Sequence, residues 1–457
     1  MKNLMRQFFV LVSLSYMTLF CHSMHGQEIF WQKRYGGSDL DNVNSVIPTR
    51  DKGYLILSYS SSGISGDKTE PCFGEYDIWL LKFNRHDTLE WQKTIGGNKA
   101  DSPVGAFQME DDGYLILANS SSGISGNKTV ASKGGDDYWL IKLDRLGKIE
   151  WQKSIGADST DSPSVFIQTV DGNFIACGSS YSGISGDKTE KSRGRVDLWL
   201  VKIDKNANII WDKTVGGNHD DVCSGGFALS DSSFTISATS ISKVNGDKTV
   251  PLIGNDDIWV LNINSYGKII YQKALGTAIA DNGARAMVEV GDDIWVSGNI
   301  GNNSGAKPQF DPAIYLLDRK GTLKDSFIFE ADKDDAISRI SSTYNGGFFS
   351  SVVSKSGISG IKSDTSRGGR DLWLVRLDKN KKLLWDKTFG GNLDESAPSF
   401  IEYEPGHYLI FCTSSSRISG DIKVDGKGTN DILIIKLKDH TIPKCCFLRW
   451  WNKIFNG

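Results

Sequence analysis

The hydrophobic and polar positions along the chain form short strand-like runs, with no amphipathic run of helix length. One stretch contains four such runs in succession: SPVGAFQM (102–109), YLILANS (114–120), DYWLIKLD (137–144) and KIEWQKSIG (148–156). They are rich in β-branched and aromatic residues, and turns such as EDDG and RLG separate them. This pattern is typical of antiparallel strands joined by hairpins, and it predicts four strands, here called a, b, c and d in chain order.

The four-strand unit is repeated along the chain. The motif W(Q/D)K in strand d begins, with one tyrosine, at Trp31, Trp91, Trp151, Trp211, Tyr271 and Trp385, and Asp325 takes the tryptophan position of one degenerate unit. An aspartate before strand c gives the same register, at Asp77, Asp137, Asp197, Asp257, Asp311, Asp371 and Asp431. Successive aspartates differ in number by 60, 60, 60, 54, 60 and 60, so the sequence predicts seven units, of which the fifth is shortened.

Four antiparallel strands in every repeated unit predict one blade of a β-propeller for each unit. The chain begins this pattern with an extra d strand, EIFWQKRYGG, and ends it with a c strand, NDILIIKLKD, that has no d strand after it. We therefore predict an all-β, seven-bladed β-propeller from about Glu28 to Asp439, in which the N-terminal d strand joins the last a, b and c strands and closes the ring. An open solenoid is the alternative.

The tryptophans occupy two repeated positions. Strand c carries one two residues after its aspartate, and strand d carries the other; the set is Trp79, Trp139, Trp199, Trp259 and Trp373, with Trp31, Trp91, Trp151, Trp211 and Trp385. Large rings at the same place in successive blades predict structural packing between blades. Stacking on sugars is the functional alternative.

The N-terminal segment, 1–26, resembles a signal peptide. Lys2 and Arg6 precede an apolar stretch, residues 8–20, which is short for a membrane span. We expect cleavage after Gly26, or after Ser23, and an exported chain that is secreted, periplasmic or on the cell surface. The expected parts are a signal peptide (1–26), a propeller (27–439) and a basic, aromatic tail (440–457), the one part where membrane contact is expected.

Composition narrows the classes of partner and chemistry. Lysine plus arginine (52) nearly balances aspartate plus glutamate (55), so we expect no nucleic-acid partner. The seven cysteines are scattered, which argues against a disulfide-built scaffold and a zinc site. Cys21 is a lipidation candidate, although the bulky residue before it disfavours that reading. The adjacent pair Cys445 and Cys446 lies in the tail.

The stretch SGISGDKT (62–69) looks at first like a phosphate-binding loop. However, Asp67 separates its second glycine from Lys68, and related copies join strand b to strand c in six units. These long loops share one face of the ring with the d-to-a crossovers, and long loops on a rigid scaffold are usual binding sites. The ligand-binding candidates on this face are Asp67, Lys68, Asp187, Lys188, Asp247 and Lys248.

An acidic residue ends each crossover, just before strand a. These residues are Asp41, Asp101, Asp161, Asp221, Asp281, Asp335 and Glu395. A ring of carboxylates at the channel would suit calcium, which prefers oxygen ligands. The favoured alternative is that each acid caps its own turn through backbone amides, and we expect no firm metal site and no cofactor.

Two family resemblances follow from these motifs. The spacing of Asp144 and Gly147 to Trp151 resembles the tryptophan-docking repeat of quinoprotein-like propellers, a class with both dehydrogenases and assembly scaffolds. The whole unit, DGYLIL, SSSGISG, DYWLIKLD and WQK…GG, more closely resembles secreted repeat proteins common in Bacteroidetes. That resemblance implies an extracellular propeller without assigned chemistry. Many such proteins end in a type IX sorting domain, which is not recognisable here.

No set of residues marks a catalytic centre, because sevenfold repetition produces many acids and singles out none. The sequence therefore predicts a non-catalytic binding or scaffold module whose ligand is an extracellular protein or glycan. An enzyme acting on glycans or on a quinone-linked substrate at the loop face is the alternative. The fifth unit departs most from the pattern, through drift or because it forms a ligand notch.

Overall fold

The computed structural model describes residues 26–283, 286–302, 309–343 and 346–441. The predicted signal peptide, apart from Gly26, and the tail beyond Thr441 lie outside the described residues. In the part that is described, all regular structure is β-strand, and no helix is long and apolar enough to cross a membrane.

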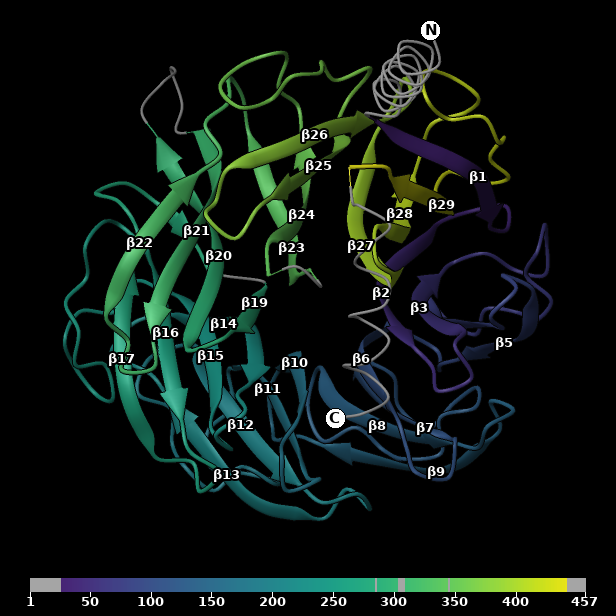
Figure 1. The fold of residues 1–457 in the computed structure, drawn as a ribbon. Helices are drawn as coiled ribbons and strands as arrows, with labels where there is room; N and C mark the ends of the chain where they lie inside the picture. Colours follow the sequence, from purple (N-terminus) through teal and green to yellow (C-terminus); the bar gives the residue numbers. More distant parts are fainter. Residues whose placement is uncertain (1–25, 284–285, 303–308, 344–345, 442–457) are drawn as a thin grey trace, which may run out of the picture.

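Seven antiparallel sheets surround a central axis, so the predicted seven-bladed β-propeller is confirmed (Figure 1). Within each regular blade the strands follow chain order from the channel outward. Blades 1 to 4 comprise β2 (Asp41–Pro48), β3 (Tyr54–Ser60), β4 (Asp77–Phe83) and β5 (Leu89–Ile95); β6 (Asp101–Gln108), β7 (Tyr114–Ser120), β8 (Asp137–Leu143) and β9 (Ile149–Ile155); β10 (Asp161–Gln168), β11 (Phe174–Ser180), β12 (Asp197–Ile203) and β13 (Ile209–Val215); β14 (Asp221–Ala228), β15 (Phe234–Ser240), β16 (Asp257–Ile263) and β17 (Ile269–Leu275).

The later blades include the two exceptions to this order. Blade 5 comprises β18 (Asp281–Asn282), β19 (Met287–Val290), β20 (Asp293–Asn302), β21 (Gln309–Asp318) and β22 (Leu323–Ile328); blade 6 comprises β23 (Asp335–Ser342), β24 (Phe348–Ser354), β25 (Asp371–Leu377) and β26 (Leu383–Phe389); blade 7 comprises β27 (Glu395–Glu404), β28 (His407–Ser414), β29 (Asp431–Asp439) and β1 (Gln27–Tyr35). In blade 5 the inner strand is broken into β18 and β19, which both pair with β20. The shortened unit therefore has an irregular channel wall.

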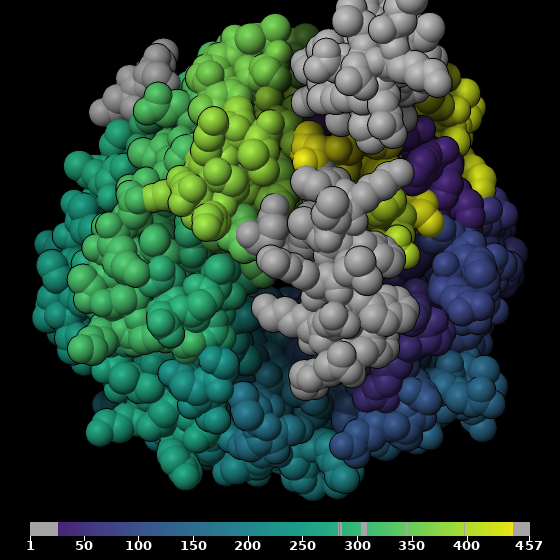
Figure 2. Space-filling model, viewed as in Figure 1, coloured from purple at the N-terminus to yellow at the C-terminus, as the bar shows by residue number. Residues whose placement is uncertain are grey.

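The ring closes through a blade made from both ends of the chain. β1 pairs with β29 in antiparallel register, from Gln27 opposite Asp439 to Tyr35 opposite Ile432. Figure 1 shows the purple β1 beside the yellow β29, and Figure 2 shows the colours running around the disc until purple meets yellow. The predicted closure by the N-terminal d strand is confirmed, and it gives the outer edge of β29 a hydrogen-bonded partner.

The strand c tryptophans are the largest side chains of the core. All five are fully buried, and each packs between hydrophobic strands of adjacent blades. The indole N–H of each strand c tryptophan shown here donates to the side chain that follows the strand d tryptophan. Trp79 Nε1 lies 2.9 Å from Gln92 Oε1, and Trp199 Nε1 lies 3.1 Å from Asp212 Oδ2. The WQK and WDK motifs therefore satisfy a polar group that each of these blades buries.

Candidate functional site

The SGISGDKT loop is fixed to the crossover that enters its own blade. Ser65 Oγ accepts the amide of Ser38 at 2.9 Å, and Ser62 Oγ accepts that of Asp39 at 2.9 Å. Gly66 has φ of 56° and sits against the crossover, because a Cβ there would lie 2.2 Å from the oxygen of Gly36. The loop joins two strands rather than a strand and a helix, so its amides do not form the helix-terminal cradle that phosphate binding requires.

The loop lysines point into the protein. Lys68, Lys188 and Lys248 are each 1% exposed. Lys68 Nζ donates to the Glu70 carbonyl at 2.7 Å and to Thr94 Oγ1 at 2.8 Å. Burial lowers the pKa of all three lysines. Their ammonium groups are engaged inside the loop, which accounts for them as structural residues, and ligand binding by them stays a prediction.

The loop aspartates link neighbouring blades. Asp67 accepts the amide of Gly36 at 3.1 Å and pairs with Lys427 of the preceding blade. Asp187 forms an ion pair with Lys133, and Asp247 accepts Arg193 Nε at 2.7 Å. These contacts join one b–c loop to the next around the ring. The three aspartates are partly exposed, but their carboxylates already have partners on the protein.

The acids that begin strand a lie inside the blades. All seven are at most 2% exposed, and in six of them the carboxylate accepts a backbone amide four residues earlier, as Asp41 does from Gly37 at 2.6 Å. A serine hydroxyl of the b–c loop adds a second bond, from Ser62 to Asp41 at 3.0 Å. Burial raises the pKa of Asp41 and Asp101. This is the geometry of a turn cap.

In the described part of the chain, the acids that begin strand a are not grouped as the ligands of a metal ion would be. Among the described residues, no group of three or more His, Cys, Asp or Glu side chains is placed to hold a metal ion. One oxygen of each acid accepts a bond from its own turn or loop, while Oδ1 of Asp41, Asp161 and Asp221 has no hydrogen-bond partner among the described residues. Calcium binding at this ring therefore stays a prediction, to be decided by titration.

A cavity of about 910 Å³ lies at the mouth of the channel, lined by strand a residues of blades 3, 4, 6 and 7 and by strands b and c of blade 5. Blades 3 to 7 all contribute to its wall, and most of the contributors are small or hydroxyl-bearing. Larger groups come from Asn299, Phe310, Asp334 and Arg370. Blade 5 contributes Asn299 of β20 and Phe310 of β21 to this cavity. Whether the irregular fifth unit is a ligand notch or the product of drift therefore stays an open prediction.

The charged groups of the cavity are accessible to a ligand. Asp334 is exposed, and its carboxylate accepts the amide of Phe310 at 3.2 Å. Arg370 is exposed, and within the described residues its guanidinium has no hydrogen-bond or ion-pair partner. A bare guanidinium beside hydroxyl groups and an aromatic ring can bind hydrogen-bond acceptors and stack on a planar or apolar face.

One variable position of the repeat supplies two residues of this mouth, Phe310 and Arg370. The aspartate that begins strand c is kept in all seven units, yet the residue just before it differs in nearly every blade: Tyr76, Asp136, Val196, Asp256, Phe310, Arg370 and Asn430. These residues stand at the loop-face end of strand c, close to the next crossover, as the bridge between Tyr76 and Ala100 shows. A constant aspartate therefore begins strand c, and the variable residue before it reaches the cavity in blades 5 and 6. Comparison of the repeats with one another could have found this signal in the sequence.

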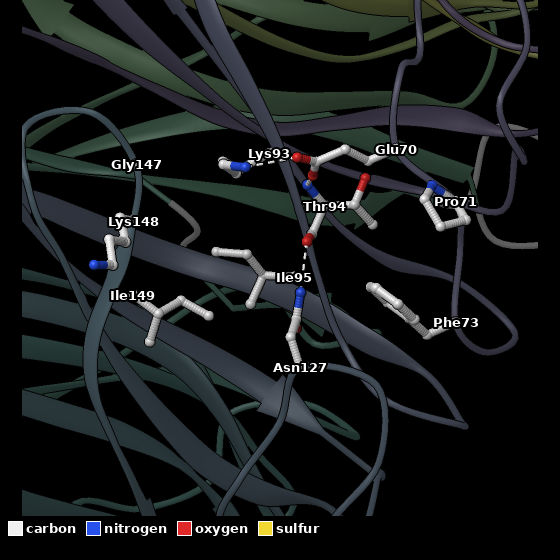
Figure 3. Close-up of a pocket in the computed structure, with 10 residues that line it drawn as sticks. All are labelled: Glu70, Pro71, Phe73, Lys93, Thr94, Ile95, Asn127, Gly147, Lys148 and Ile149. Carbon is white, nitrogen blue, oxygen red and sulfur yellow. Dashed lines mark hydrogen bonds and ion pairs between the residues drawn. The ribbon is translucent and has the colours of Figure 1, made fainter.

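A second kind of hollow lies on the outer wall between blades. Between blades 1 and 2 its volume is about 370 Å³, and Figure 3 shows Phe73, Ile95 and Ile149 around it. At one side Glu70 accepts Lys93 Nζ and the Thr94 amide, both at 2.6 Å. A related hollow of about 440 Å³ lies between blades 3 and 4. Such grooves recur between blades as part of the repeated structure, so they are weaker candidates for a specific ligand site than the channel mouth.

The fold and site define a seven-bladed β-propeller with a cavity at the channel mouth, and comparison with known proteins adds no closer class. No family model and no curated protein sequence matches the chain. Solved structures similar in fold include a protein of unknown function from Dyadobacter fermentans (10% identity, 91% of this chain and 100% of that chain, TM-score 0.47). The Pan2 WD40 domain of Neurospora crassa (10%, 91% and 96%, 0.49) and a protein of unknown function from Bacteroides caccae (11%, 68% and 90%, 0.36) are also similar. Likeness at this distance says nothing about ligand or activity.

Proposed function

We propose that the chain is an exported, non-catalytic binding module that holds an extracellular protein or glycan at the channel mouth on the loop face. The observation that supports this is the difference between constant and variable positions of the repeat. The aspartate that begins strand c is constant in all seven units, whereas the residue before it varies and contributes Phe310 and Arg370 to the 910 Å³ cavity. A closed ring is rigid, and a rigid frame with variable groups at one cavity suits selective binding.

The signal-peptide pattern of residues 1–26 supports the export part of this proposal. It is tested by fractionation of cells that express the full chain, together with N-terminal sequencing of the product. A new N-terminus at Gln27 or at residue 24 in an extracytoplasmic fraction is the expected result. An uncleaved chain confined to the cytoplasm would contradict export.

The binding part is tested with a glycan array and with immobilised extracellular proteins, using the chain from Gln27 onward, which contains every strand of the ring. Phe310→Ala and Arg370→Ala should each weaken binding of any ligand found by about tenfold or more, as expected when a central contact is lost. Tyr76→Ala is the matched control, because Tyr76 occupies the same repeat position outside the cavity. Equal losses in all three variants would contradict the proposed site.

Catalysis is the competing function for the same cavity. An enzyme needs one unique polar cluster, and Asp334 and Arg370, which both line the cavity, are the groups to test. Turnover of a glycoside or an alcohol that disappears in Asp334→Ala would overturn the non-catalytic proposal.

A further inference from the structure

The third residue of each SGISG loop is an exposed aliphatic side chain. Six loops have one, and its exposed fraction is high in every case: Ile64 69%, Ile124 69%, Ile184 65%, Val244 58%, Ile358 71% and Ile418 61%. We call these six residues the aliphatic tips. All lie on the loop face, outside the cavity at the mouth. The sequence alone suggests no role for them, because a hydrophobic residue in a repeat is ordinarily taken for core.

The tips are held in place by a rigid local frame. On one side of Ile124, Ser122 Oγ accepts the amide of Lys99 at 3.0 Å; on the other, Ser125 Oγ accepts that of Asn98 at 2.8 Å. The glycine two residues after each tip has φ between 51° and 59° in all six loops. Five of the six loops have the same pair of amide-to-serine bonds to the crossover, and the loop of Val244 has one of the two. The tips therefore recur at equivalent places around the ring.

Random sequence drift does not explain the recurrence of an exposed aliphatic residue at this repeat position. The opposite face also exposes apolar side chains, such as Leu146 (59%), Val170 (63%) and Tyr266 (83%). Leu146 and Tyr266 share one repeat position, but the other units have polar residues there: His86, Asn206, Lys320 and Asn380. Single exposed apolar residues are ordinary, whereas six at one repeated position indicate a shared contact. The tryptophan of strand d has been lost in two units, so retention of the exposed tips reflects more than common descent of the repeats.

The aspartates of four tip loops are paired with cations. Four links between adjacent loops pair an aspartate with a lysine or arginine: Asp67 with Lys427, Asp187 with Lys133, Asp247 with Arg193, and Asp421 with Arg367. The surface around the tips therefore offers small polar groups and paired carboxylates, together with Lys243 beside Val244 and Arg417 beside Ile418. Such a surface favours an uncharged apolar partner over one selected by charge.

We propose that the aliphatic tips bind a lipid bilayer surface by entering its interfacial region. A flat bilayer meets all six tips at once, whereas a folded partner without the ring's symmetry meets only one or two of them. Isolated aliphatic side chains, four of them flanked by glycine and serine, need no shape complementarity in a fluid acyl boundary. Because the loop aspartates are paired, they do not repel a lipid headgroup region, and the contact is apolar and needs only a zwitterionic surface.

This contact goes beyond the proposed ligand binding and does not depend on it. Variants of the cavity leave the tips in place, and variants of the tips leave the cavity in place. If both hold, a bilayer at the tips turns the channel mouth toward the membrane, so the ligand of the cavity is one displayed at a membrane surface.

The experiment is flotation of the chain from Gln27 onward with phosphatidylcholine vesicles, at low and at high salt. The tip variant is Ile64→Ser, Ile124→Ser and Ile184→Ser combined; the matched control is Leu146→Ser, Val170→Ser and Tyr266→Ser combined. The wild-type chain and the control should float to the same extent. The tip variant should bind at least about tenfold more weakly, because binding scales with the apolar area that enters the interface. The substituted side chains are exposed, so all chains should melt at similar temperatures.

Salt distinguishes apolar from electrostatic binding. The proposed contact should be unchanged by high salt, since screening acts only on charges. Flotation that requires anionic lipid and is abolished by salt would overturn the proposal, as would a tip variant that floats like the wild type. A wild-type chain that does not float also overturns it; if sedimentation then shows a dimer that only the tip variant loses, the tips contact a second copy of the chain instead.

Discussion

Arg34 in β1 forms a buried ion pair with Asp431 at the start of β29, with 2.9 Å between Nε and Oδ2. The guanidinium also donates to the carbonyls of Ser416 at 2.5 Å and Ser414 at 2.6 Å. In another blade Lys188 Nζ donates to the equivalent carbonyl, that of Ser182, at 2.9 Å. Blade 7 thus obtains the same buried cation from strand d rather than from the loop.

Comparison with the other blades identifies the two positions at which blade 7 differs. Where other loops carry lysine, blade 7 has Ile422, which is buried, and where blade 1 has Thr94, blade 7 has Arg34. Arg34→Thr should destabilise the ring by about 3–5 kcal/mol, because it leaves the Asp431 carboxylate buried without its partner. Chemical denaturation followed by tryptophan fluorescence measures the loss.

A second substitution should rescue that loss. Ile422→Lys alone places a second cation beside Arg34 and should also destabilise the chain. The double variant Arg34→Thr with Ile422→Lys restores the lysine–threonine arrangement of blade 1, so most of the stability should return. Additive losses in the double variant would contradict the equivalence of the two cations.

The loop glycines differ sharply in what they tolerate. Gly66→Ala forces a non-glycine residue to φ near 56° and directs its Cβ at the oxygen of Gly36, so we expect a loss of about 1–3 kcal/mol. Gly63→Ala is the control in the same loop, because no atom lies within 4 Å of its Cβ position. It should change the melting temperature little or raise it slightly. Equal effects at the two glycines would show that the loop is not held against the crossover.

A buried carboxyl pair makes stability depend on pH. Burial, reinforced by the neighbouring Glu395 and opposed by the Arg367 amide, raises the pKa of Asp371 to about 7. The unfolded value is about 4, so between about pH 4 and 7 the folded protein holds a proton that the unfolded chain releases. This contribution to the free energy of unfolding is full below about pH 4 and falls by up to about 1.4 kcal/mol per pH unit until pH passes 7.

Melting curves at pH 5 to 8 test this dependence. Asp371→Asn keeps an oxygen for the Arg367 amide and offers an N–H toward Glu395, so the decline in stability over this range should become shallower. Asp292→Asn, at an exposed turn of blade 5, should leave the decline unchanged. An Asp371→Asn chain with the wild-type pH profile would exclude Asp371 as its source.

Calcium should not stabilise the ring if the strand a acids serve as turn caps. At least one oxygen of each acid accepts an amide or a serine hydroxyl, as Asp101 does from Gly97 and Ser122, both at 2.7 Å. We therefore expect the same melting temperature with millimolar calcium and with a chelator. A rise of several degrees with calcium, lost in Asp101→Asn, would restore the metal hypothesis.

The repeat made most of the fold predictable from the sequence. The period of the strand c aspartate located each blade, and the unpaired strand d at the N-terminus predicted the pairing of β1 with β29. The loop lysines were harder, because charged residues in a polar loop look solvated. Lys68 is buried by the Thr94 and Glu70 groups that accept its hydrogen bonds, and no local pattern encodes that encounter.

The cavity could be predicted only in part. The sequence marked the fifth unit as irregular, but the cavity becomes a candidate site only when Phe310 and Arg370, which belong to successive units, are brought to one wall. The aliphatic tips were not predicted, for the opposite reason. Isoleucine in a repeat suggests burial, and its exposure depends on which way the loop turns, a property set by Gly66 and its contact with the crossover.

The mixed composition of blade 7 has a consequence for the order of assembly. β1 is the first strand to be synthesised and its partner β29 is the last, so about 400 residues are added between Arg34 and its partner Asp431. Until residue 439 is available, the nascent chain is an open arc with two unsatisfied sheet edges. Ring closure is therefore a single late event, and the time between the first strand and the last is the interval in which the chain depends most on protection from aggregation.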